Sequence, residues 1–309
     1  MKEYVGAEVL LLSRVIKADS IAFPFGGRNP MWAALWLKTL NKSVHLNDLT
    51  AFNYWDAVGM VENTGERFSK EQILNLTEGF KPKLDQLSNP ELTRLVPRDD
   101  THFFDQLRTR IDDLQPSLKG MAIRAGYLTI RYVQNLDTSA SYQSLRQPLP
   151  MVFHNLLKLQ NVRVTDNGEG HAHRQEAREF VKKPRADVLF MQLPTPEGIN
   201  LEQFKGERVL GPVGREIWTS GPAKTWLPTM REAVRDTFGD KLITQEAYDQ
   251  ALLQLLDSAK DYPIWVFNLQ ESDYVKVLNV VKNFRKPKAV HRFDARGGIG
   301  GYMNLFLVA

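Results

Sequence analysis

The sequence has no cysteine among its 309 residues. Disulfide bonds, cysteine nucleophiles and cysteine-ligated zinc or iron–sulfur centres are therefore excluded, and the absence fits a cytoplasmic protein. No apolar run approaches the roughly 20 residues that a membrane-spanning helix needs. The first ten residues include acidic side chains and no long apolar core, which is not the pattern of a signal peptide. We therefore expect a soluble cytoplasmic protein without a membrane partner.

The composition is that of an ordinary globular protein, with 43% hydrophobic and 25% charged residues. A chain of this length can form one large α/β domain, or one such domain that carries an insertion. The formal net charge of +4 is compatible with nucleic-acid binding and equally with a basic enzyme. Neither a Walker-type phosphate loop nor a Ser-His-Asp arrangement can be recognised.

The first 62 residues have the pattern of a nucleotide-binding α/β unit. A strand over 20–25 is broken by Gly26-Gly27 and followed by a helix; a second strand, over 44–48, ends on Asp48 and precedes another helix. Glycines let backbone amides approach a ligand, and a carboxylate after the second strand can accept hydrogen bonds from ribose. Two alternatives remain open, because the glycines could form only a turn and Asp48 could cap the next helix.

The remainder divides into a helical middle and a second α/β region. Prolines punctuate the segment after residue 63, and we expect 85–150 to be a mainly helical insertion whose arginines are offset by aspartates. The predicted α/β domain then consists of 1–84 and 151–309. From residue 151 the predicted elements are a helix to 159, a strand over 161–166, a helix over 169–182, a strand over 187–191, an irregular loop over 197–228, a helix over 245–260, a strand over 262–268, a helix over 272–283, and two strands, 289–293 and 302–308, paired as an edge hairpin.

Four segments, taken in chain order, form a series. They are Pro24–Gly27, Leu46–Asp48, Leu156–Asp166 and the closing pair of strands. They resemble the cofactor loop, the acidic strand end, the strand before the catalytic one and the final hairpin of adenine-specific DNA methyltransferases.

The resemblance implies a Rossmann-like methyltransferase sheet with the insertion as a candidate target-recognition region. It also implies DNA as a partner and S-adenosylmethionine as the cofactor. The residues that it implies for cofactor binding are Phe25, Gly26, Gly27, Asp48 and Asp166.

The segment after the strand over 187–191 departs from that family. Gln192-Leu193-Pro194-Thr195 stands where the family has Asp-Pro-Pro-Tyr. Methyl transfer to an exocyclic amine needs acceptors that hold the amine and an aromatic ring that stacks on the extruded base. Gln192 keeps an amide oxygen on a stem that is one methylene longer, whereas Thr195 cannot stack. We predict that Gln192, Pro194 and Thr195 form a catalytic position with impaired activity.

The sequence leaves open whether the chain is an enzyme. One hypothesis is a DNA adenine methyltransferase in which Gln192 replaces the usual acid. The other is a catalytically inactive pseudo-methyltransferase that binds DNA or a partner subunit. Without the family resemblance, the segment around Gln192 would also be compatible with an ordinary strand exit.

Three further features have both a functional and an ordinary interpretation. His171 and His173 offer metal donors, but on the predicted helix they do not share a face, which favours a solvated polar helix and no metal site. Trp218 and Trp226 could contact a base or a partner, although such tryptophans more often anchor a loop. Arg296 could contact phosphate or lie in an exposed hairpin.

Overall fold

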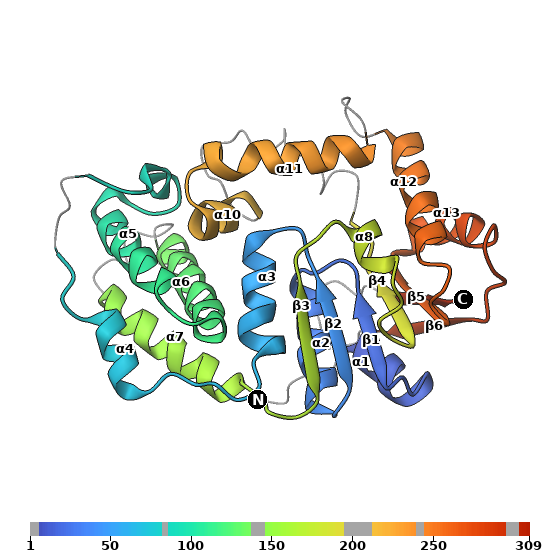
Figure 1. Cartoon of the computed structure of the whole chain (residues 1–309), viewed down its shortest axis with the longest axis horizontal. Helices are drawn as coiled ribbons and strands as arrows, with labels where there is room; N and C mark the ends of the chain where they lie inside the picture. Colours follow the sequence, from blue (N-terminus) through green and yellow to red (C-terminus); the bar gives the residue numbers. More distant parts are fainter. Residues whose placement is uncertain (1–5, 82–85, 137–145, 195–211, 239–243, 295–302) are drawn as a thin grey trace. The chain divides into compact units, whose positions relative to one another are not determined.

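A computed structural model describes residues 6–81, 86–136, 146–194, 212–238, 244–294 and 303–309 (Figure 1). The chain packs as two compact units. Unit 1 comprises Met1–Leu49, Asn167–Asn200 and Glu232–Ala309, whereas unit 2 comprises Thr50–Asp166 and Leu201–Arg231. Across the ranges that the structure describes, no helix is both long and apolar enough to cross a membrane.

Unit 1 is built on a seven-stranded mixed sheet, with strand order β3-β2-β1-β4-β5-β7-β6. The strands are β1 (Ser20–Phe23), β2 (Ser43–Asn47), β3 (Glu169–His173), β4 (Val188–Met191), β5 (Ile264–Leu269), β6 (Ala289–Asp294) and β7 (Met303–Val308). Strands β1 to β5 pair in parallel, and β7 runs antiparallel to both β5 and β6. The chain is therefore an α/β protein whose sheet is compatible with a Rossmann-like fold, and the predicted edge hairpin is confirmed.

The central strands carry apolar side chains on both faces, as expected of buried parallel strands. On one face, side chains of β4, β5 and β7 pack against α8 (Ala177–Val181), α12 (Gln245–Ser258) and α13 (Glu271–Val281). Phe190 also contacts Phe23 and Phe306, with ring centroids 5.3 and 6.2 Å apart. Unit 1 further contains α1 (Ala7–Leu10), the π-helical η1 (Leu11–Val15) and α2 (Arg28–Thr39), which packs on β2. The sheet is thus a rigid base for the loops at its ends.

Unit 2 is helical in the part that the structure describes. Its elements are α3 (Ala51–Ala57), η2 (Val58–Glu62), α4 (Lys70–Thr77), η3 (Pro90–Arg94), α5 (Arg98–Asp112), α6 (Pro116–Leu136), α7 (Leu149–Arg163), α10 (Pro212–Ser220) and the first part of α11 (Ala223–Phe238). Gly59 and Gly120 let η2 approach α6 closely, because a Cβ on Gly120 would lie 2.5 Å from the Gly59 nitrogen. This unit is larger than the insertion predicted over 85–150, since it also includes α3, α4 and α7.

Three predicted elements are wrong. Residues 161–166 form no strand, because α7 continues to Arg163 and the Asn161 side chain bonds both the amide and the carbonyl of Phe68, each at 2.9 Å. The predicted helix over 169–182 is the strand β3 followed by the short helix α8. The predicted irregular loop is helical from Pro212 onward, in α10 and α11. In the first case, the alternating valines 162 and 164 imitate a strand, and tertiary contacts override that local pattern.

Candidate functional site

The chain order of the parallel strands reverses at β1, which lies between β2 and β4. In open α/β sheets, ligands bind outside the carboxyl ends of the strands at such a switch point. Phe25 follows β1, Asp48 follows β2 and Gln192 follows β4, so all three lie at the carboxyl edge of this sheet. Phe25 and Leu193 also pack against the same apolar cluster. The structure therefore brings these three sequence-predicted residues to one edge of unit 1.

The loop after β1 lies directly against Asp48. A Cβ on Gly26 would come within 2.5 Å of Asp48 Oδ2, so only glycine fits beside that carboxylate. Gly27 is needed for a different reason, because its φ of 103° lies in the left-handed region that favours glycine, while an added Cβ would meet nothing within 4 Å. Gly27 is also the N-cap of α2. The two glycines are thus more than a simple turn: one admits the carboxylate, and the other starts the helix.

Asp48 is not the N-cap of α3. That position belongs to Thr50, whose hydroxyl accepts a 3.4 Å hydrogen bond from the amide of Asn53. The Asp48 amide donates to the carbonyl of His173 at 3.1 Å, which ties Asp48 to the end of β3. Asp48 therefore does not have the helix-capping role that the sequence left open.

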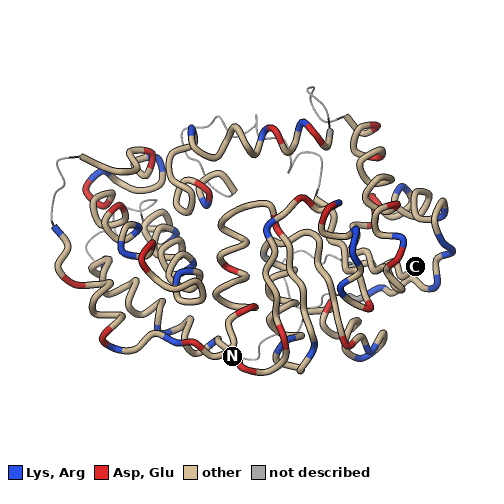
Figure 2. The backbone as a smooth tube through the Cα atoms, in the orientation of Figure 1, with Lys and Arg blue, Asp and Glu red and all other residues tan. Residues whose placement is uncertain are grey.

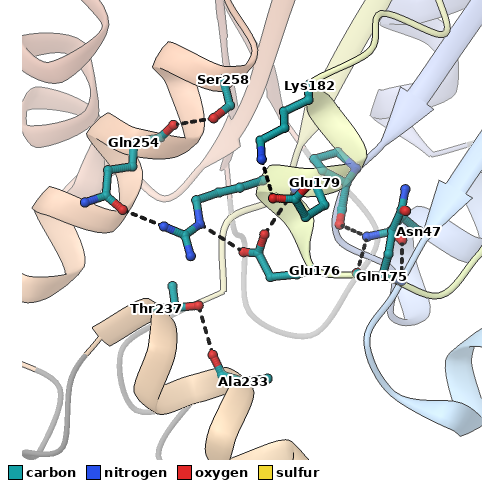
Figure 3. A network of polar contacts seen from close by, with 11 residues as sticks. Asn47, Gln175, Glu176, Glu179, Lys182, Ala233, Thr237, Gln254 and Ser258 are labelled. Carbon is teal, nitrogen blue, oxygen red and sulfur yellow. Dashed lines mark hydrogen bonds and ion pairs between the residues drawn. The ribbon is translucent and has the colours of Figure 1, made fainter.

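Sequence reasoning missed Asn47, which is only 1% exposed. Its amide nitrogen donates to the carbonyls of Pro24 and Gln175, both at 3.0 Å, and its Oδ1 accepts from the Gln175 amide at 3.2 Å. Figure 3 shows the side chain of Asn47 beside Gln175. Asn47 therefore joins the loops after β1, β2 and β3, and the only signal for it was a polar residue at the end of an apolar strand.

The loop that leads from β3 into α8 is anchored to α12. The carboxylate of Glu176 caps α8 by accepting from the Glu179 amide at 3.1 Å, and it also accepts from Arg178 at 3.3 Å. Arg178 in turn donates to Gln254 Oε1 at 2.6 Å. These contacts, which are part of the polar network in Figure 3, fix the position of the loop at the carboxyl edge.

Gln192 is partly buried, and its Oε1 is buried without a hydrogen-bond partner in the part of the chain that the structure describes. Two residues later, the carbonyl of Pro194 accepts a 2.8 Å hydrogen bond from the hydroxyl of Tyr248 on α12. Burial and the carboxylates of Asp273 and Asp249 raise the pKa of Tyr248, so its hydroxyl stays protonated and remains a donor. Thr195 lies outside the described residues. Helix α12 therefore holds the loop after β4, and the Gln192 amide oxygen in this loop is buried without a partner among the described residues.

Asp166 does not end a strand, contrary to the expectation for this residue. It precedes β3 and is assigned to unit 2. The residues that follow β3 at the carboxyl edge are Arg174 and Gln175, and Gln175 Nε2 is buried without a partner among the described residues. Gln175 is thus the polar side chain that the strand order places where Asp166 had been expected.

His171 and His173 share one face because they lie on a strand, and His45 on β2 joins them. The rings of His45 and His171 stack with centroids 4.5 Å apart, and His45 Nδ1 lies 3.2 Å from His173 Nε2. Burial, neighbouring imidazoles and Arg185 lower the pKa of His45 to about 4; burial, Arg185 and His171 do the same for His173. Within the described ranges, no three His, Asp or Glu side chains are placed to hold a metal ion. The solvated polar helix expected here is replaced by a cluster of stacked imidazoles.

Both tryptophans of the predicted loop are buried, and Trp218 has the anchoring role. Trp218 is fully buried and donates to the carbonyl of Ile123 at 2.8 Å, whereas Trp226 is 8% exposed and donates to the carbonyl of Gly221 at 3.1 Å. Neither ring is available to stack on a base. Arg296 lies outside the described residues.

The chain matches no protein-family model, and no curated protein matches its sequence. The fold and the edge site place it in a broad class, the α/β proteins with a mixed, Rossmann-compatible sheet. Any narrower assignment depends on the residues at the carboxyl edge.

Proposed function

We propose that this chain is a DNA adenine methyltransferase-like protein that binds S-adenosylmethionine at the carboxyl edge of unit 1. The observation that carries the proposal is the close approach of the Gly26 backbone to the Asp48 carboxylate, at the same sheet edge as the loop that begins with Gln192. A glycine loop, an acid after the neighbouring strand and a polar residue after β4 are the three parts that the family resemblance implies. The antiparallel closing hairpin is further support.

The residues present fit the proposed cofactor. Asp48 supplies a carboxylate for ribose hydroxyls, and the space in front of Gly27 lets a ligand approach the backbone closely. Gln175 offers a buried donor without a partner among the described residues. S-adenosylmethionine would supply an electrophilic methyl group, while Gln192 Oε1 would accept a hydrogen bond from the amine that receives it. The buried and unpartnered state of that oxygen is consistent with this role, because such groups call for a functional or solvent partner.

We propose that catalysis is impaired rather than efficient. Gln192 places its oxygen one methylene further from the backbone than the usual acid, and a displacement of about 1 Å can reduce a rate on the order of 100-fold. Among the residues that the structure describes, Tyr248 is the aromatic residue whose hydroxyl bonds this loop. Its hydroxyl is already engaged in holding the carbonyl of Pro194. A second candidate function, a pseudo-methyltransferase that binds DNA or a partner subunit, follows if the missing stacking ring abolishes transfer.

Calorimetric titration with S-adenosylmethionine tests the cofactor site. We expect the wild-type protein to bind and Asp48→Asn to weaken the affinity about 10- to 100-fold, because the variant loses a charge-assisted hydrogen bond at nearly constant size. The control is Asp19→Asn, since Asp19 is 89% exposed and precedes β1 at the opposite edge of the sheet. Equal binding, or equal absence of binding, by wild type and Asp48→Asn rejects the proposed site.

Transfer of labelled methyl groups to DNA then separates the two functions. Weak incorporation by the wild type, abolished in Gln192→Ala, supports an impaired enzyme. Incorporation that is no higher than in Gln192→Ala, beside measurable binding of the cofactor and of DNA, supports the pseudo-methyltransferase.

A further inference from the structure

One short segment carries enough unbalanced positive charge to account for the net positive charge of this chain. Residues 274–293 contain six of the 40 Lys and Arg residues and none of the 36 Asp and Glu residues. Without this segment the chain would have 34 basic and 36 acidic residues, a formal charge of −2 in place of +4. The excess positive charge of the whole molecule therefore comes from 20 consecutive residues.

This segment contains the greater part of α13, the connection to β6 and most of β6 itself. Figure 2 shows the blue Lys and Arg positions following one another from α13 into the connection before β6. Five of the six cations are exposed, and none of these five forms an ion pair within the described residues: Lys276, Lys282, Lys286, Lys288 and Arg292. We call these five residues the α13–β6 basic surface.

The sixth cation, Arg285, shapes this surface. Its guanidinium donates to the carbonyls of Lys260, Tyr262 and Pro263 and lies 3.7 Å from the centre of the Trp265 ring. These carbonyls precede β5, so Arg285 pins the connection to the amino edge of the sheet. The α13–β6 basic surface thus includes the edge opposite Gly26, Asp48 and Gln192.

Protection of an exposed sheet edge explains only part of this pattern. Strand β6 is the last strand of the sheet, and lysine, arginine and proline commonly discourage edge-to-edge pairing. That role accounts for Lys288 and Arg292, which point to the same side of β6 with the exposed Val290 between them. It does not account for Lys276 on α13 or for Lys282 at the C-cap of that helix.

We propose that the α13–β6 basic surface binds the phosphate backbone of duplex DNA. A duplex carries one negative charge per about 1.7 Å of its axis, so a surface with several unpaired cations can displace several condensed counterions. Lys276 lies on α13 and Lys282 is its C-cap, about 9 Å further along the helix axis. Lys288 immediately precedes β6 and Arg292 lies on it, about 13 Å further along the extended chain. Among the side chains whose burial the structure describes, Val275 and Val290 are the strongly exposed apolar ones here, which is too little for membrane insertion or for an apolar hot spot with a protein partner.

The test compares two variants of equal net charge. One is Lys276→Gln/Lys282→Gln/Lys286→Gln/Lys288→Gln in the full chain. The matched control is Lys17→Gln/Lys70→Gln/Lys158→Gln/Lys224→Gln, at four exposed lysines outside the segment. Binding of a labelled random-sequence duplex is measured between about 50 and 200 mM salt. We expect the surface variant to bind at least about tenfold more weakly and the slope of log affinity against log salt to fall by about 3, with little change in the control.

Several outcomes overturn the proposal. An unchanged affinity in the surface variant does so, and so does an equal loss in the control, which would make net charge the cause. Binding to anionic phosphatidylserine vesicles but not to the duplex would assign the surface to membranes. If the surface variant aggregates while its monomer binds the duplex as tightly as wild type, protection of the sheet edge is the only role of these lysines. Titration of the same variant with S-adenosylmethionine is expected to match wild type, so failure of this proposal is distinguishable from failure of the cofactor site.

Discussion

In the proposed function, Gln192 is the side-chain acceptor that would hold the amine in methyl transfer, and its own oxygen has no partner among the described residues. Asn carries the same amide on a stem one methylene shorter, closer to the length of the acid that the family resemblance leads us to expect. We predict that Gln192→Asn raises methyl incorporation into DNA above wild type, by up to about 100-fold if the acceptor position limits the rate.

The measurement for this prediction is the single-turnover rate with labelled cofactor. Gln192→Ala supplies the baseline without an acceptor. Cofactor affinity should be the same in all three proteins, because the proposed function assigns Gln192 to the methyl-accepting amine and not to ribose binding. If Asn and Ala give equal rates while both bind the cofactor, the amide oxygen has no role in transfer.

Among single residues, the placement of Gly26, Gly27 and Asp48 at one sheet edge was predictable, because glycine and a strand-terminal acid have few structural substitutes. Their role in cofactor binding stays a prediction. Asn47 was not, since its three hydrogen bonds join loops up to 128 positions apart. Tyr248 was missed for the same reason: nothing near residue 248 indicates a contact with Pro194.

Among the secondary-structure elements, the histidines show that the predicted neighbours of a side chain depend on whether its segment is assigned as a helix or as a strand. Residues two apart lie on different faces of a helix but on the same face of a strand, so the incorrect helix separated His171 from His173. The strand β3 places them beside His45, in register with β2. The core strands and most helices were predictable from apolar periodicity, whereas β3 was not, because it is polar and lies at the edge of the sheet.

The histidine cluster predicts that stability falls with acid. The folded-state pKa values of His45 and His173 are about 4, below the ordinary value of 6.5, so the unfolded chain binds more protons between these limits. The contribution of the two neutral histidines to the free energy of unfolding is complete above pH 6.5 and is lost as the pH falls toward 4. Allowing for solvent screening of these partly exposed groups, we expect a loss of about 1 to 2 kcal/mol per histidine.

Urea unfolding at pH 7 and at pH 4.5 measures this loss, and His45→Gln/His173→Gln is the comparison. The variant should show a smaller decrease than wild type between the two pH values, because the imidazoles that resist protonation are gone. His171 remains in both proteins, as does Arg185, whose positive charge also opposes protonation of the cluster. If the free energy of unfolding falls equally with pH in the two proteins, the acid sensitivity does not come from His45 and His173.

At the scale of the whole molecule, both units are discontinuous in sequence, which local patterns cannot reveal. Unit 2 draws α10 from a segment that follows β4, and that helix completes the packing of earlier helices. The buried Glu216 of α10 accepts hydrogen bonds from the amides of Ala51 and Phe52 at 3.2 and 2.9 Å, and so caps the start of α3. Trp218 meets the ring of Phe104 at a centroid distance of 6.0 Å. A boundary drawn from composition alone at 85–150 therefore misses contacts that this unit needs.

These contacts predict that residues 50–166 alone form an unstable fragment. Loss of a buried tryptophan typically costs about 3–5 kcal/mol, and the total stability of a domain is only about 5–15 kcal/mol. The fragment also loses the carboxylate that satisfies two amides of α3. The control is residues 50–166 joined by a flexible linker to residues 201–231, which restores Glu216 and Trp218 without unit 1. Circular dichroism during urea unfolding should show a cooperative transition for the linked protein, and a much lower midpoint or no transition for the fragment. Equal midpoints would mean that α10 packs on a unit that is already stable, and that Glu216 and Trp218 contribute little to its folding.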